Sequence, residues 1–182
     1  MTKQEIIDSL IVSHRRFSEY ISVLGDQAFS FSLNDEKWTA GQQADHICRS
    51  LFPLQIVLGF PKWFSKLIFK KANRPSKTYE ELVNKYIQKL ENGGRATGRF
   101  IPGRIEPGQK TILKNKIEKL IIKLSSSLHK FSEKEMDNLV LPHPLLGRLT
   151  LREMMYFTIY HVEHHHKIAI RNLDGNISGS NS

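Results

Sequence analysis

The chain contains one cysteine, Cys48, among its 182 residues. A single cysteine cannot form an intrachain disulfide, and it cannot build a zinc site that uses several thiolates. Any metal ion must therefore be held by histidine and carboxylate side chains. Because Cys48 sits among apolar residues such as Ile47 and Leu51, we interpret it as a small core residue rather than as a nucleophile.

Long apolar runs are also missing. No uninterrupted stretch approaches the roughly 20 residues that a membrane-spanning helix needs. The first ten residues carry Lys3, Glu5 and Asp8, and charges at these positions do not fit a secretory signal. We therefore expect a cytoplasmic protein without a membrane partner.

Acidic residues are outnumbered, since 18 aspartates and glutamates face 27 lysines and arginines and the formal net charge is +9. An excess of positive charge can favour nucleic acids or other anions. The basic residues are spread along the chain, however, and those between Lys110 and Lys123 fall mainly on the polar side of a predicted helix. We interpret them as a solvated surface. A basic nucleic-acid-binding module is kept only as the weaker alternative.

Strand patterns and internal repeats are absent, whereas helical periodicity recurs along the chain. Apolar residues repeat at three- and four-residue spacing, and Thr39 and Thr78 are placed to cap two of the helices. The predicted helices cover residues 2–24, 39 onward, 78–90, 111–131 and 150 to about 173.

These segments predict an all-α fold, a four-helix bundle with up-and-down helices. A long loop, residues 92–108, lies between the third and fourth segments and contains five glycines and two prolines. Such a loop is typical of a lid or pocket wall, or of a mobile connection. We expect one domain over residues 1–173 and a disordered tail over residues 174–182, which has little to bury.

Four of the eight histidines lie between positions 161 and 166. At about 100° per residue, His161 and His165 project within roughly 40° of each other on the apolar side of the last helix. Two imidazoles at this spacing can chelate one metal ion. The alternative is a hydrogen-bonded pair without metal, which would leave buried lone pairs to be satisfied. His164 and His166 fall at the edges of that side.

Zinc proteases use the same spacing but need a glutamate directly after the first histidine. Here Val162 occupies that position, and Glu163 points away from the apolar side. The chain is therefore not predicted to be a protease of that class.

A histidine pair is an incomplete site, because zinc usually takes three protein ligands and keeps one open position. The best candidate for the third ligand is His46, in the second predicted helix. His14 and His143 remain alternatives, although His14 also fits a hydrogen-bonded core histidine.

Two stretches of the chain resemble the DinB-like superfamily. Residues 143–151, with the sequence HPLLGRLTL, are followed by the pair His161 and His165, and this order resembles the C-terminal signature of that family. The segment 38–46, from Trp-Thr to a histidine, resembles the family in a less specific way. The resemblance covers most of the chain in the same order.

The resemblance implies a four-helix bundle, often a homodimer, with one divalent metal ion held by His46, His161 and His165. Zinc or nickel would be the metal. Relatives include thiol S-transferases, among them bacillithiol transferases, and proteins described as metal-dependent hydrolases. We therefore expect a metal-dependent enzyme that acts on a small-molecule substrate, either by hydrolysis or by transfer of a low-molecular-weight thiol. The alternative is a non-enzymatic metal-binding or stress-associated bundle.

Overall fold

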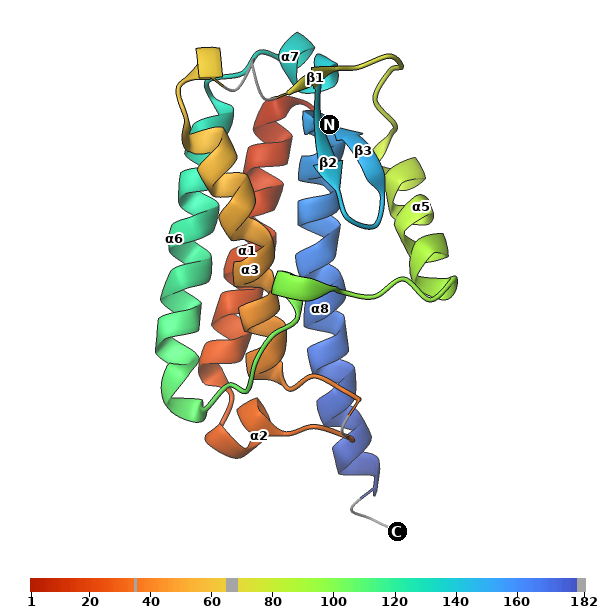
Figure 1. Cartoon of the computed structure of the whole chain (residues 1–182). Coiled ribbons are helices and arrows are strands. Elements are labelled where there is room, and N and C mark those ends of the chain that lie inside the picture. Colours follow the sequence, from red (N-terminus) through yellow and green to blue (C-terminus); the bar gives the residue numbers. More distant parts are fainter. Residues whose placement is uncertain (35, 65–68, 180–182) are drawn as a thin grey trace.

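The computed structural model describes residues 1–34, 36–64 and 69–179, and the side chains of these residues up to 174. Four long helices form a bundle (Figure 1), as the sequence predicts. They are α1 (Lys3–Val23), α3 (Ala40–Gly59), α6 (Lys110–Leu128) and α8 (Leu151–Gly179). Their apolar sides meet in one core, to which Leu10, Leu51, Ile117 and Met155 contribute from the four helices.

Long helices that follow one another in the chain are not always neighbours in space. Both α1 and α3 pack mainly on α6 and α8 and make few contacts with each other. Figure 1 shows α3 and α6 running in the same direction, opposite to α1 and α8. The four long helices therefore do not alternate in direction as the predicted up-and-down order would require, and the chain must return along the whole bundle between α3 and α6. This long return carries α5 (Tyr79–Glu91), which packs on the outer side of α8.

Shorter elements complete the fold. They are α2 (Asp26–Ser30), α7 (Glu133–Asn138) and two 3-10 turns, η1 (Gly98–Phe100) and η2 (Pro107–Gln109). The first turn lies within the predicted long loop, residues 92–108, and the second begins at its end and runs to Gln109. The rest of this loop, which lies within the described residues, has neither helix nor strand.

A small antiparallel sheet is the feature that the sequence did not predict. Its order is β1 (Lys70–Lys71), β2 (Leu139–His143) and β3 (Gly147–Thr150), with Val140 opposite Thr150. These strands are too short for an alternating pattern to be recognised. The mostly helical class is confirmed, with this sheet as an addition at one end of the bundle.

Capping boxes begin the helices where the sequence placed them. The Thr39 hydroxyl accepts a hydrogen bond from the Gln42 amide at 3.1 Å, and the Gln42 side chain accepts one from the Thr39 amide at 3.0 Å. Thr150 and Glu153 form the same reciprocal pair at the start of α8. Such pairs satisfy amide groups that have no partner inside the helix. They set where α3 and α8 begin.

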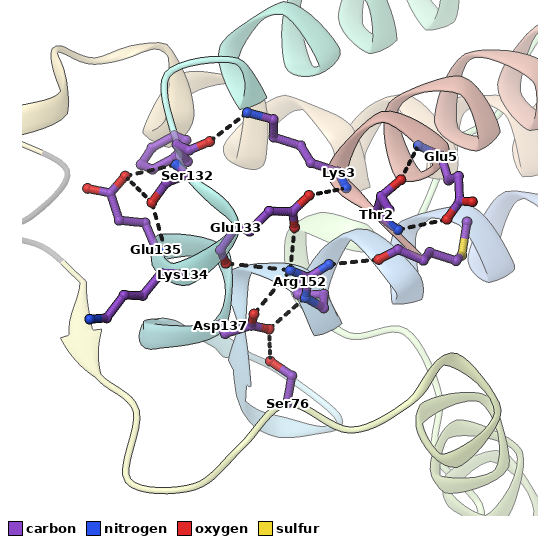
Figure 2. A network of polar contacts seen from close by, with 12 residues as sticks. Thr2, Lys3, Glu5, Ser76, Ser132, Glu133, Lys134, Glu135, Asp137 and Arg152 are labelled. Carbon is purple, nitrogen blue, oxygen red and sulfur yellow. Dashed lines mark hydrogen bonds and ion pairs between the residues drawn. The ribbon is translucent and has the colours of Figure 1, made fainter.

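A network of ion pairs holds the N-terminal turn of α8 in place (Figure 2). Arg152 donates to Asp137 and to Glu133, both at 2.6 Å, and to the carbonyl of Met1 at 2.9 Å. Glu133 in turn accepts a hydrogen bond from the amide of Lys3 at 2.7 Å. The network therefore ties α8, α7 and the N-terminus together at this end of the bundle.

The last helix extends beyond the expected end near Leu173 and reaches Gly179. No proline follows in the sequence, and adding a residue to an existing helix gains a backbone hydrogen bond at little entropic cost. The expected disordered tail, residues 174–182, is thus helical over its first part, and residues 180–182 lie outside the described residues. Among the helices that the structure describes, none is long and apolar enough to cross a membrane.

Candidate metal centre

Three buried histidines converge inside the bundle. His46 comes from α3, and His161 and His165 come from adjacent turns of α8. The Nε2 atom of His161 lies 3.1 Å from Nε2 of His46 and 3.0 Å from Nε2 of His165. The three candidate ligand atoms all lie within 4.8 Å of one another. The structure therefore brings together the three residues that the family resemblance implied.

In two of these rings the second nitrogen, Nδ1, is hydrogen-bonded to an oxygen. The Nδ1 atom of His46 donates to the Phe100 carbonyl at 2.7 Å, and Nδ1 of His165 donates to the Gln43 side-chain oxygen. Because these oxygens only accept, each ring carries its proton on Nδ1 and presents a lone pair at Nε2. Both lone pairs face His161.

This arrangement fits a metal ion. A single Nε2 proton on His161 could satisfy only one of the two lone pairs, and a buried lone pair without a partner costs free energy. A divalent cation would satisfy all three nitrogens. Neutral imidazole is a good ligand for zinc and nickel, and an outer hydrogen bond on the second ring nitrogen is typical of histidines that bind metal.

The three imidazoles are kept neutral. Burial lowers the pKa of His161 and of His165 well below the usual 6.5, and the neighbouring histidines lower it further. Burial also lowers the pKa of His46, although its bond to the Phe100 carbonyl acts in the opposite direction. A metal ion entering the site near neutral pH would thus not have to displace protons from the nitrogens.

Aromatic side chains enclose the cluster. The Trp38 ring lies 5.0 Å from that of His46 and is stacked 6.1 Å from that of His165. Phe157 is stacked on His161 at 4.7 Å. These apolar rings limit the access of water and favour one orientation of each imidazole.

The remaining histidines of the run do not join the cluster. His164 packs against Tyr86, with ring centroids 5.8 Å apart, and His166 packs against Tyr20 at 4.6 Å. Glu163 is exposed, as the helical geometry predicted.

The two alternative third ligands, His14 and His143, do not belong to this group of three histidines. His14 is buried on α1 and donates from Nδ1 to the Leu10 carbonyl at 2.8 Å. His143 is the last residue of β2, where its Nδ1 accepts from the amides of Leu145 and Leu146 in the following turn, at 3.2 and 3.1 Å. Both are held by local hydrogen bonds and lie outside the group of converging nitrogens.

Cys48 is buried in the core, as predicted. Burial raises the pKa of its thiol to about 12, so the thiolate that a nucleophile requires is not formed near neutral pH.

Two partners of the cluster were not predicted from the sequence. The carbonyl of Phe100 comes from the long loop and cannot be recognised from a side-chain pattern. Gln43 carried a weak signal, since it lies three residues before His46 and therefore shares its side of the helix.

Replacing Gln43 by alanine is expected to lower the affinity for a divalent metal by about 10- to 100-fold, the effect typical of losing an outer hydrogen bond on a ligating histidine. Without Gln43, the Nδ1 proton of His165 loses its acceptor and the ring loses its fixed orientation. Isothermal titration with zinc would measure the change. Gln55→Ala on the same helix is the control, and an equal loss in both variants would contradict this role of Gln43.

Acid is expected to destabilise the metal-free protein through His14. Burial lowers the pKa of His14 from 6.5 to about 4, an effect that outweighs its hydrogen bond to the Leu10 carbonyl. The unfolded chain therefore takes up a proton first as the pH falls. The contribution of His14 to stability is complete above pH 6.5, is lost progressively between pH 6.5 and about 4, and amounts to about 3 kcal/mol.

Urea unfolding at several pH values would measure this loss. In His14→Gln, which does not titrate, the free energy of unfolding should fall less steeply over the same interval. Equal slopes for the two proteins would show that His14 does not contribute.

Comparisons with known proteins agree with the fold and with the family resemblance. The family model described as the DinB superfamily matches residues 9–169. Among solved structures, the chain is similar to YfiT from Bacillus subtilis, described as a probable metal-dependent hydrolase with an unusual four-helix bundle topology. The TM-score is 0.55 at 17% sequence identity, covering 93% of this chain and 84% of that chain. No curated protein matches. At this identity the structural likeness concerns the fold.

Proposed function

Because this chain belongs to the DinB superfamily, we propose that it is a metal-dependent enzyme acting on a small molecule, with one divalent ion held by His46, His161 and His165. One observation carries the proposal, the convergence of three buried Nε2 atoms with two lone pairs directed at the third ring. A core packed for stability alone has no need of three imidazoles whose lone pairs compete for one proton.

The protein's own groups would hold and orient the ion. Gln43 and the Phe100 carbonyl keep the Nδ1 protons of His165 and His46 in place, so that Nε2 is available on both rings. The aromatic rings of Trp38 and Phe157 restrict water around the cluster. When bound by three histidines, a zinc or nickel ion supplies an open coordination position and acts as a Lewis acid toward water, a thiol or a carbonyl.

Two reactions remain within this proposal. Hydrolysis is favoured by the similarity of fold to a protein described as a probable metal-dependent hydrolase. Transfer of a low-molecular-weight thiol is favoured by the family resemblance alone. A homodimer likewise remains a prediction from that resemblance.

The test combines metal analysis with turnover. Protein expressed without a tag is reconstituted with zinc or nickel, and its metal content is measured by elemental analysis. It is then assayed with an ester, with an amide, and with an electrophile plus a thiol. About one ion per chain, with turnover that a chelator abolishes and the metal restores, would support the proposal.

The non-enzymatic alternative has a different outcome. If the ion is structural, its removal should unfold the bundle, whereas a catalytic ion should leave most of the helix content intact. Absence of stoichiometric metal in the reconstituted protein would reject the proposal.

A further inference from the structure

A row of exposed apolar side chains runs along the outer side of α3 and past its end. Phe52, Ile56, Phe60 and Trp63 are 52%, 39%, 41% and 67% exposed. The first three are spaced by four residues, which places them on one side of the helix. Phe64 joins them, because its ring lies 4.7 Å from that of Phe60 and 5.8 Å from that of Trp63. We call these five residues the aromatic face.

The aromatic face is not explained by the core or by the metal centre. The buried side of α3 carries His46, Ile47 and Leu51, whereas Phe52 and Ile56 point outward from the same helix. An apolar surface that is contiguous and exposed usually marks a site of interaction.

The stretch of chain that carries the aromatic face is rich in basic residues. Residues 46–79 contain no aspartate or glutamate. The same stretch contains seven basic residues. Arg49 and Arg74 are paired with Asp45 and Glu153, which lie outside the stretch. Lys70 and Lys71 are exposed on β1.

Another cation comes from outside this stretch. The ammonium group of Lys130 bonds to the carbonyls of Leu58 and Gly59, at 3.3 and 3.1 Å, and so lies beside the end of α3. α7 contributes a negative charge, because its Glu135 pairs with Lys62 at 2.7 Å. Acidic partners are thus fewer than the cations in and beside the stretch of chain that carries the aromatic face.

We propose that the aromatic face docks the protein onto an anionic membrane surface. Exposed tryptophan, phenylalanine and isoleucine side chains insert into the boundary between headgroups and acyl chains, while nearby lysines attract anionic lipids. The sequence led us to expect no membrane partner because no segment can span a bilayer. Attachment to a surface needs no spanning segment, and the exposure of these side chains is a property of the folded protein.

Two other partners for the aromatic face are less favourable, a second copy of the chain and single-stranded nucleic acid. A second copy of the chain docked through this face would bring two basic surfaces together, which is unfavourable. Single-stranded nucleic acid binds where aromatic rings line a positively charged groove, whereas Phe52 and Ile56 project from the outer side of a helix.

Cosedimentation of the full chain with lipid vesicles tests the proposal. Vesicles of phosphatidylcholine alone are compared with vesicles that contain phosphatidylglycerol in equal part. We expect binding to the anionic vesicles only, together with a blue shift of the fluorescence of Trp63. The double variant Phe52→Ser/Trp63→Ser should lower the partition coefficient by at least about tenfold, because it removes two large apolar side chains from the interface.

A second pair of variants separates the charge from the apolar contact. Lys70→Glu/Lys71→Glu should weaken binding to anionic vesicles and reduce its dependence on salt. Val23→Ser/Ile112→Ser, which removes exposed apolar residues of α1 and α6, is the matched control and should bind like the natural chain.

The proposal would be overturned by equal binding to both kinds of vesicle or by no binding to either. Unchanged binding of Phe52→Ser/Trp63→Ser, or a shared loss in the control, would also overturn it. Sedimentation equilibrium and titration with oligothymidine identify the competing occupants. A dimer, or a complex with oligothymidine, that is lost in Phe52→Ser/Trp63→Ser would assign the face to that partner instead.

Discussion

Replacing either His161 or His165 by alanine is expected to abolish stoichiometric metal binding, with a loss of affinity of at least about 100-fold, since removing a ligand should exceed the effect of removing its outer hydrogen bond. Each variant leaves two nitrogen donors and a small apolar side chain at a buried position. A cation that has lost one of three ligands in such an environment cannot recover the hydration it gave up. Elemental analysis after reconstitution and titration with zinc would measure the loss.

His164→Ala is the control for this experiment, because it belongs to the same run of histidines but its ring lies outside the converging group. It should bind metal like the natural chain. If His164→Ala lost the ion while His161→Ala kept it, the run would be acting as a surface chelator and the buried site would be rejected. Circular dichroism must show that helix content persists in all three variants.

Arg74→Ala is expected to destabilise the protein by about 3 kcal/mol, the lower end of the range for breaking a buried ion pair. Arg74 donates to both carboxylate oxygens of Glu153, at 2.5 and 2.8 Å, and the Glu153 side chain is fully buried. The carboxylate would keep its hydrogen bonds from the amides of Lys77 and Thr150, at 2.7 and 2.9 Å, but would lose its counter-charge. Urea unfolding near neutral pH would measure the change in free energy.

The acid response provides a second readout of this pair. Burial acts to raise the pKa of Glu153, but the hydrogen bonds from Arg74 and from the two amides hold it below its usual 4.5. The stabilisation is therefore complete above pH 4.5 and is lost as the pH falls through the lower pKa of the folded state. In Arg74→Ala, the loss of stability below pH 4.5 should be smaller than in the natural chain.

Arg104→Ala is the matched control for Arg74→Ala. Arg104 also pairs with a glutamate, Glu106, at 2.6 Å, but the two side chains are 89% and 59% exposed. Exposed ion pairs contribute little to stability, so this variant should unfold like the natural chain to within about 0.5 kcal/mol. Equal effects of the two substitutions would mean that burial of Glu153 does not set the strength of its ion pair.

Both predictions concern α8, which carries two of the candidate ligands. Glu153 belongs to the capping box at the start of this helix, and His161 lies two turns further along. A destabilised start of α8 is expected to lower the melting temperature without removing the metal. Loss of an imidazole is expected to remove the metal while the helices stay folded. The two variants therefore separate the stability of the helix from the function of the site.

Local features of the chain were predictable from the sequence. The capping residues Thr39 and Thr78 begin helices as expected, because a cap depends on residues only three positions apart. The pair His161 and His165 shares one side of α8, because the pitch of a helix sets that geometry without help from the rest of the fold. The apolar periodicity likewise predicted the four long helices of the bundle.

The small sheet could not be predicted in the same way. β1 is two residues long and pairs with β2, so that Lys70 lies opposite Val140, seventy positions later in the chain. Strands this short carry little pattern of their own, and their hydrogen bonds exist only after the bundle has brought the segments together. The long return between α3 and α6, which sets the directions of the helices, is also a property of the assembled bundle.

By itself, the sequence determined which side chains could bind a metal and which face of α8 presents them, because helix geometry is local. It named His46 as the best third partner but left His14 and His143 open, and the family resemblance then supported His46. The tertiary structure decided which distant histidine lies beside His161. Residues more than a hundred positions apart can come into contact only after α3 and α8 have packed together. Packing also buried one side of α3 around His46 and left its other side, with Phe52, exposed to a partner.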